Sequence, residues 1–154
     1  MLQAMLTALE QWPAVVALRG STWTYPLVNA AHILGLALLF GSIVPLDLRL
    51  AGFWPALALA PLRRVLVPVA IAGLLLAAAS GFLLFAAKAT QYAASGWFLA
   101  KIALVLLALA NAVLLRLAPG WKAGGEGPWP RMAGLASIAL WSGAIVLGRM
   151  VGYF

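Results

Sequence analysis

Residues 26–46 read PLVNAAHILGLALLFGSIVPL, an almost uninterrupted apolar stretch. As a helix rising about 1.5 Å per residue, it is long enough to cross a hydrocarbon layer of about 30 Å. Similar stretches follow at residues 65–87, 97–117 and 131–151. Only 8% of the chain is charged, against about 25% in soluble domains, and 66% is hydrophobic. We therefore expect an all-α fold, an integral membrane four-helix bundle that forms a single transmembrane domain over residues 1–154.

Residues 1–20 show a different pattern. Apolar residues recur there every three or four positions, with polar residues opposite them. This pattern is typical of an amphipathic helix that lies on a membrane surface. No basic segment precedes the apolar residues, unlike in a secretory signal peptide. The sequence thus predicts an N-terminal interfacial amphipathic helix, which Pro13 is expected to bend or end.

The composition excludes several classes of function. The formal net charge is +7, but the basic residues are scattered near the ends of the apolar stretches, where they serve membrane topology rather than nucleic-acid binding. The chain has no cysteine, which excludes disulfides, thiolate metal sites and iron–sulfur clusters. Its acidic residues are Glu10, Asp47 and Glu126, and none is predicted near His32, the only histidine. A Ser–His–Asp hydrolase is therefore not expected.

The distribution of basic residues predicts the orientation in the membrane. They are more numerous in the first and third connecting loops than on the opposite side, which makes those two loops cytoplasmic. Both termini would then be periplasmic in the inner membrane of a bacterium, with the chain crossing it several times. Asp47 is expected to pair with an arginine at the inner surface. The residues counted are Arg49, Arg63, Arg64, Arg116, Lys122 and Arg131 against Arg19, Lys88 and Arg149.

Polar residues converge in the outer half of the predicted bundle. An ionisable side chain inside a membrane span is costly, which makes His32 a functional candidate. Asn29 lies on the same helical face as His32, and Lys101 lies at a similar depth in the third span. We predict a cationic cofactor site there, composed of His32, Lys101, Arg149, Asn29, Trp97 and Ser142, with His32 and Met150 as metal ligands.

Each of these residues also has a structural interpretation. A lone histidine in a span can simply form a hydrogen bond to a neighbouring helix. Lys101 and Arg149 can extend their charged ends to the head groups, and Met150 can serve packing alone. Aromatic residues near the ends of the spans, including Trp97, are typical of interface anchors.

Two runs resemble known families. Residues 32–50, HILGLALLFGSIVPLDLRL, resemble the first-helix signature of small bacterial membrane proteins through His32, Gly41 and Arg49. Residues 95–111, SGWFLAKIALVLLALAN, are similar to the matching helix of HemJ-type protoporphyrinogen oxidases and of the CopD-type copper-resistance membrane domain. The shared features there are Trp97 and Lys101. The whole chain resembles uncharacterised four-helix bacterial inner-membrane proteins of this broad superfamily.

The resemblance implies a haem b or copper site. In the HemJ type, a first-helix histidine binds haem and a third-helix lysine belongs to the active centre, and the matching residues here are His32 and Lys101. HemJ-type proteins carry further histidines, which this chain lacks. That departure argues against protoporphyrinogen oxidation itself.

Three functions follow from these observations. The first is a small haem b-binding redox protein, in which Lys101 and Arg149 pair with the propionates and Met150 can lie opposite His32. Its partners would be quinone or a periplasmic electron carrier. The second is a copper-handling protein, which needs a homo-oligomer because His32 with Met150 or Met132 supplies too few ligands. The third is a non-catalytic accessory subunit of a larger membrane complex.

Overall fold

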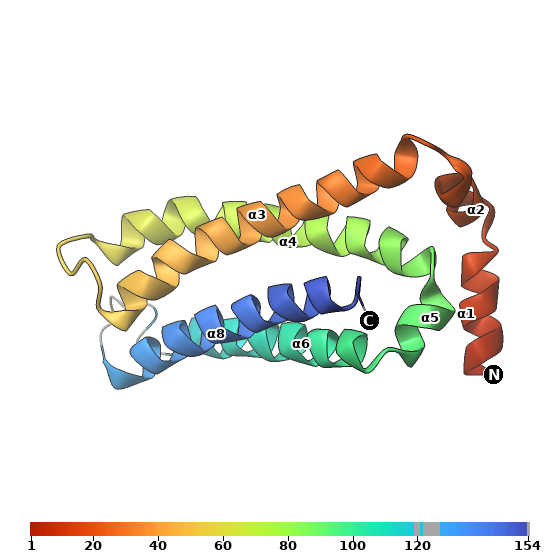
Figure 1. The fold of residues 1–154 in the computed structure, drawn as a ribbon. Coiled ribbons are helices and arrows are strands. Elements are labelled where there is room, and N and C mark those ends of the chain that lie inside the picture. Colours follow the sequence, from red (N-terminus) through yellow and green to blue (C-terminus); the bar gives the residue numbers. More distant parts are fainter. Residues whose placement is uncertain (119–120, 122–126, 154) are drawn as a thin grey trace.

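The computed structural model describes residues 1–118, 121 and 127–153, and these contain seven helices and no strand. Four of the helices are long and apolar enough to cross a membrane. They pack lengthwise as a bundle, so the predicted all-α four-helix architecture is confirmed (Figure 1). The helices are α1 (Leu2–Glu10), α2 (Pro13–Gly20), α3 (Thr24–Ala51), α4 (Leu59–Ala86), α5 (Ala89–Ala94), α6 (Gly96–Leu117) and α8 (Pro128–Met150).

The first two spans are longer than their apolar stretches. α3 continues to Ala51 and ends where Gly52 takes a left-handed conformation with φ of 106°, which glycine adopts without strain. α4 begins at Leu59, and Pro61 lies within its first turn, where a missing N–H is tolerated. Polar residues at the helix ends are therefore part of the helices, which a hydropathy pattern alone does not show.

The four spans form two layers, α3 with α4 and α6 with α8 (Figure 1). α3 also packs on α8, whereas the backbones of α4 and α6 do not approach closely, and side chains such as the stacked rings of Phe85 and Phe98 meet between them. Small residues allow the closest approach, since a Cβ on Gly35 would lie 2.6 Å from the backbone nitrogen of Ala77. On α6, the Asn111 amide donates a 2.9 Å hydrogen bond to the carbonyl of Ala133 on α8. The two layers are thus joined by close packing between α3 and α8, whereas the backbones of α4 and α6 stay apart.

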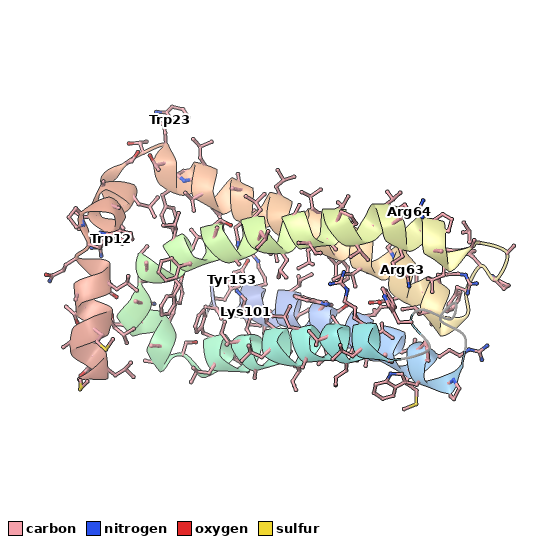
Figure 2. The ribbon with its side chains drawn as sticks, turned by 180° about the vertical axis from the view of Figure 1, so that it is seen from behind. Trp12, Trp23, Arg63, Arg64, Lys101 and Tyr153 are labelled. Carbon is pink, nitrogen blue, oxygen red and sulfur yellow. The ribbon has the colours of Figure 1, made fainter. Side chains whose placement is uncertain are left out.

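The two ends of the bundle differ. At one end, which we call the cap end, α1, α2 and α5 lie across or beside the spans (Figure 1). The expected interfacial segment is two helices, because Pro13 begins α2 after the break at Gln11 and Trp12. α5 was not predicted from the sequence. The opposite end, the arginine end, holds Arg63 and Arg64, far from Trp12 and Trp23 at the cap end (Figure 2).

Two arginines at that end bind backbone carbonyls. Arg49 Nε donates to the carbonyl of Leu57 at 2.6 Å, and Arg63 Nη1 donates to that of Trp121 at 2.6 Å. Asp47 instead faces the bundle interior, and its Oδ2 has no hydrogen-bond partner among the described residues. The predicted pairing of Asp47 with these arginines is wrong, because α3 extends past Asp47 and turns it toward α8. Lys122 and Glu126 lie outside the described residues.

The carboxylate of Glu10 on α1 binds Thr90 on α5. Oε1 of Glu10 accepts hydrogen bonds from the backbone N–H and the hydroxyl of Thr90, both at 2.7 Å. These bonds hold the pKa of Glu10 below its ordinary value, so docked α1 binds fewer protons there than detached α1 does. The contact is therefore fully present at neutral pH and is lost as the pH falls through that lowered pKa.

We expect α1 to loosen at acidic pH. Amide hydrogen exchange in residues 2–10 should rise as the pH is lowered from about 6 to about 3, after correction for intrinsic exchange rates. Thr90→Val should raise this exchange already at neutral pH, while Thr7→Val, which removes only an exposed bond within α1, should leave it unchanged. Equal protection at both pH values would contradict this role of Glu10.

Candidate functional site

A polar cavity of about 190 Å³, here called the cap chamber, lies between the two layers at the cap end. Three predicted site residues line it together: Asn29 and His32 from α3 and Lys101 from α6. Figure 2 shows Lys101 near the cap end of α6. The remaining walls are Tyr25, Gly81, Leu84, Phe85, Tyr92, Phe98, Gly148, Val151 and Gly152.

The imidazole of His32 is held against α4. Its Nδ1 lies 2.9 Å from the carbonyl oxygen of Ala77 and 3.3 Å from the hydroxyl of Ser80. A carbonyl oxygen only accepts, so Nδ1 carries the proton in this contact and Nε2 keeps its lone pair. No hydrogen bond to Nε2 is found within residues 1–118, 121 and 127–153. The predicted interior position of His32 is therefore observed, with one ring nitrogen fixed and the other unbonded.

A glycine makes room for this ring. A Cβ built on Gly81 would lie 2.9 Å from Cε1 and 3.2 Å from Nδ1 of His32. Contacts below 3.0 Å are tighter than real side chains make, so any other residue at this position would displace the imidazole. Ser80 next to it donates to the Leu76 carbonyl at 2.5 Å. The α4 backbone thus positions the His32 ring through both a hydrogen bond and its shape.

Lys101 reaches the chamber along a glycine of α8. A Cβ on Gly148 would lie 3.4 Å from Cε of Lys101. The ammonium lies 6.0 Å from the ring centroid of Phe98, within the range of a weak cation–π contact. No ion pair to Lys101 is found in the part of the chain that the structure describes. The chamber therefore has a positive group available to an anionic ligand.

Stacked aromatic rings form the cap-end wall. Phe85, Tyr92 and Phe98 stack on one another with centroids 5.3 to 6.4 Å apart. Tyr92 lies on α5, outside the spans, and burial together with the neighbouring Tyr25 raises the pKa of its hydroxyl. The phenol therefore stays protonated and can donate a hydrogen bond.

The other predicted site residues do not line the chamber. Arg149 is exposed and donates to the Tyr153 hydroxyl at 2.5 Å, with its guanidinium 4.6 Å from the Tyr153 ring centroid. Trp97 lies at the exposed start of α6. Ser142 and Met150 are partly buried on α8, outside the chamber walls. The prediction grouped these residues by their expected depth, but a shared depth does not make residues face the same space.

An apolar cavity of about 440 Å³, the lateral chamber, adjoins the cap chamber. The two share His32, Gly81, Phe85, Phe98 and Lys101 in their walls. Phe82 of α4 and Ile102 of α6 also line it and are exposed on the outside of the bundle. The lateral chamber thus occupies the gap between α4 and α6 and is open toward the lipid.

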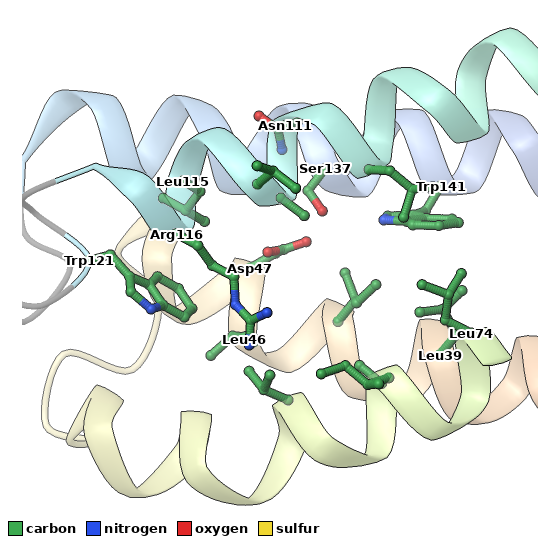
Figure 3. A pocket seen from close by; sticks show the side chains of 17 residues that line it. Leu39, Leu46, Asp47, Leu74, Asn111, Leu115, Arg116, Trp121, Ser137 and Trp141 are labelled. Atoms are coloured by element: carbon green, nitrogen blue, oxygen red, sulfur yellow. The ribbon is translucent and has the colours of Figure 1, made fainter.

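A third cavity of about 270 Å³, the inner chamber, continues toward the arginine end. It shares Leu39, Leu74 and Trp141 with the lateral chamber, and its polar wall includes Asp47 and Ser137 (Figure 3). Sequence reasoning missed this site because it assigned Asp47 to the surface. The available signal was that Asp47 is an acidic residue directly after the first predicted span, 26–46, where the helix could continue.

The fold and these cavities define a multi-pass α-helical membrane protein with a chain of ligand-sized chambers between its two layers. Comparison with protein-family models, curated proteins and solved structures finds no match to this chain. Within the described residues, no group of three or more His, Cys, Asp or Glu side chains lies together. The described residues of a single chain therefore offer no site in which several such side chains could hold a metal ion.

Proposed function

We propose that this protein is a small membrane redox protein that binds haem b beside His32. The observation that carries the proposal is the bond from His32 Nδ1 to the Ala77 carbonyl, 2.9 Å long. A hydrogen bond of this kind on one ring nitrogen orients the other as an iron ligand. The ring lines both the cap and the lateral chamber, so a ligand on Nε2 would have space on either side.

The surrounding residues suit a flat amphipathic cofactor. The lateral chamber is lined almost entirely by apolar side chains such as Leu36, Phe82 and Val105, and about 440 Å³ lies within the usual range for small-molecule sites. Lys101 would pair with a propionate, for which a cationic partner is needed away from water. Met150 does not line either chamber, so His32 would be the single protein ligand. Haem b would supply one-electron chemistry at its iron.

The proposed setting is the inner membrane of a bacterium, with both termini and the cap end on the periplasmic side. The arginines at the opposite end support this orientation through the positive-inside rule. The resemblance of the His32 and Lys101 segments to the HemJ type supports the haem assignment. In this orientation the cap chamber lies near the periplasmic surface, where a quinone or a periplasmic electron carrier would exchange electrons with the site.

An absorbance spectrum of the purified protein tests the proposal. Protein expressed with added haem precursor, or titrated with hemin in detergent, should show a Soret band that saturates at one haem per chain. Metal analysis of the same sample should find iron in equal amount. Protein that stays colourless and does not bind hemin would overturn the proposal. Stoichiometric copper without haem would favour the copper-handling function, and stable co-purification with a larger complex without any cofactor would favour an accessory subunit.

A further inference from the structure

Two buried polar atoms face the inner chamber without a partner. Asp47 is 4% exposed and Trp141 is 5% exposed. Neither Oδ2 of Asp47 nor Nε1 of Trp141 has a hydrogen-bond partner among the described residues. Figure 3 shows the indole nitrogen of Trp141 on the side of the ring that faces the Asp47 carboxylate. An unsatisfied buried acceptor and an unsatisfied buried donor therefore border one cavity.

Local packing does not account for this pair. Ser137 on α8 lines the chamber with Asp47, but it leaves Oδ2 of Asp47 without a hydrogen-bond partner. Gly134 lets α8 approach so closely that a Cβ there would lie 2.7 Å from the Asp47 carbonyl. Arg49 and Arg63 donate to backbone carbonyls instead. Arg116 lines the chamber as well, but no ion pair between it and Asp47 is found among the described residues. Leaving a buried polar group unpaired is destabilising, so a ligand that satisfies both atoms would bind favourably.

The walls indicate a ligand that arrives from the membrane. Ile71 of α4 is 43% exposed and Val113 of α6 is 54% exposed, and both line the inner chamber. The chamber is therefore open to acyl chains through the gap between α4 and α6, and most of its remaining wall is apolar. A volume of about 270 Å³ exceeds the roughly 150 Å³ that holds a benzene ring, which leaves room for ring substituents.

We propose that the inner chamber binds the ring of a lipid-soluble hydroquinone. One ring hydroxyl donates to Oδ2 of Asp47, and an oxygen across the ring accepts from Nε1 of Trp141. Ser137 and Trp141 are four residues, or about 6 Å, apart along α8, and both line the chamber with Asp47. Figure 3 shows the Asp47 carboxylate and the indole nitrogen at separate points of the chamber wall. The apolar tail leaves between α4 and α6.

Other ligand classes fit this chamber less well. The phosphate of a phospholipid could pair with Arg116, which also lines the chamber, but a phosphodiester has no donor and would leave Oδ2 of Asp47 unsatisfied. A metal ion needs several oxygen or nitrogen ligands, and the described residues place no cluster of acidic or histidine side chains there. An indole N–H, which only donates, would also face the cation unfavourably. A hydroxylated ring satisfies the donor and the acceptor together.

Binding of decylubiquinol, a short-chain hydroquinone, tests the proposal. The full chain is purified without haem, reconstituted into neutral phosphatidylcholine nanodiscs and titrated, so the outcome does not depend on the haem proposal. We expect saturable binding that Asp47→Asn weakens roughly 10- to 100-fold, since an amide replaces the carboxyl group that accepts the hydroquinone bond. Trp141→Phe, which keeps an aromatic ring but lacks the N–H, should weaken it roughly 3- to 10-fold.

Two controls make the result specific. Ser42→Ala removes another buried polar group of α3 that does not line the chamber, and it should leave the affinity within about 2-fold. Decylbenzene, which has the chain and ring but no hydroxyl, should show no difference between the native protein and Asp47→Asn. Absence of saturable binding, or equal affinity in the native protein, Asp47→Asn and Trp141→Phe, would overturn the proposal.

Discussion

Replacing Gly73 by leucine is expected to destroy the folded bundle. A Cβ alone at this position would lie 2.5 Å from the backbone nitrogen of Leu39 and 2.8 Å from the carbonyl oxygen of Gly35. These are backbone atoms of α3, which a side-chain rotation cannot move aside. α3 and α4 would have to move apart, and the packing that holds these two helices together as the first layer would be lost. Overpacking of this kind costs about 1–3 kcal/mol or more, and a full leucine lies at the upper end.

Gly41→Leu is the matched control for Gly73→Leu. Gly41 also lies within a span, on α3, but a Cβ there meets nothing within 4 Å. Size-exclusion chromatography in detergent should show a single peak for native protein and Gly41→Leu, and aggregate or a strongly lowered melting temperature for Gly73→Leu. A Gly73→Leu protein with native elution and melting behaviour would show that the two helices are not in this close contact.

Hydropathy predicted the four spans because their apolar stretches are long and nearly free of charge. It did not predict how each helix is rotated, since spans that are apolar on all sides carry little information about which face turns inward. His32 and Lys101 were predicted to converge because each is a rare polar group at a similar depth. Arg149 was predicted to lie at that depth as well, but it does not line the cap chamber and stacks on the exposed Tyr153 ring.

The separation of the α4 and α6 backbones is a property of packing that no local pattern shows. Glycines bring α3 close to α4 and to α8, through Gly73 and Gly134 respectively. The gap between α4 and α6 is left open because bulky residues such as Phe82 and Ile102 face lipid there. The chambers that result could not be predicted, because they depend on side-chain volumes from all four spans together. The same holds for the inward direction of Asp47.

The three chambers place polar groups at both ends of one largely apolar space. His32 and Lys101 lie at the cap end, and Asp47 and Ser137 lie toward the arginine end. Leu39, Leu74 and Trp141 form the wall common to the lateral and inner chambers. If both proposals hold, a hydroquinone and a haem would lie along the same gap with Trp141 between their sites. Each proposal can still fail separately, because the two use different side chains.

His32→Ala is expected to remove the bound haem. The chain has no second histidine and no cysteine, so no other imidazole or thiolate can replace the ligand. The apolar wall and Lys101 would remain, and hemin would partition into the chamber only weakly. We expect its affinity to fall at least about 100-fold, with loss of the one-to-one Soret band measured by hemin titration.

A rescue experiment separates ligation by His32 from a structural role. His32→Gly leaves a space beside Gly81 and Ala77, and added imidazole should restore the Soret band if the ring binds iron. Ser80→Ala keeps the Ala77 carbonyl that orients the ring. It removes the longer 3.3 Å contact to the ring and the bonds of the Ser80 hydroxyl to its own helix, so the hemin affinity should stay within about 3-fold. Retention of the full Soret band by His32→Ala, with unchanged stoichiometry, would show that His32 does not ligate the iron and serves only to join α3 to α4.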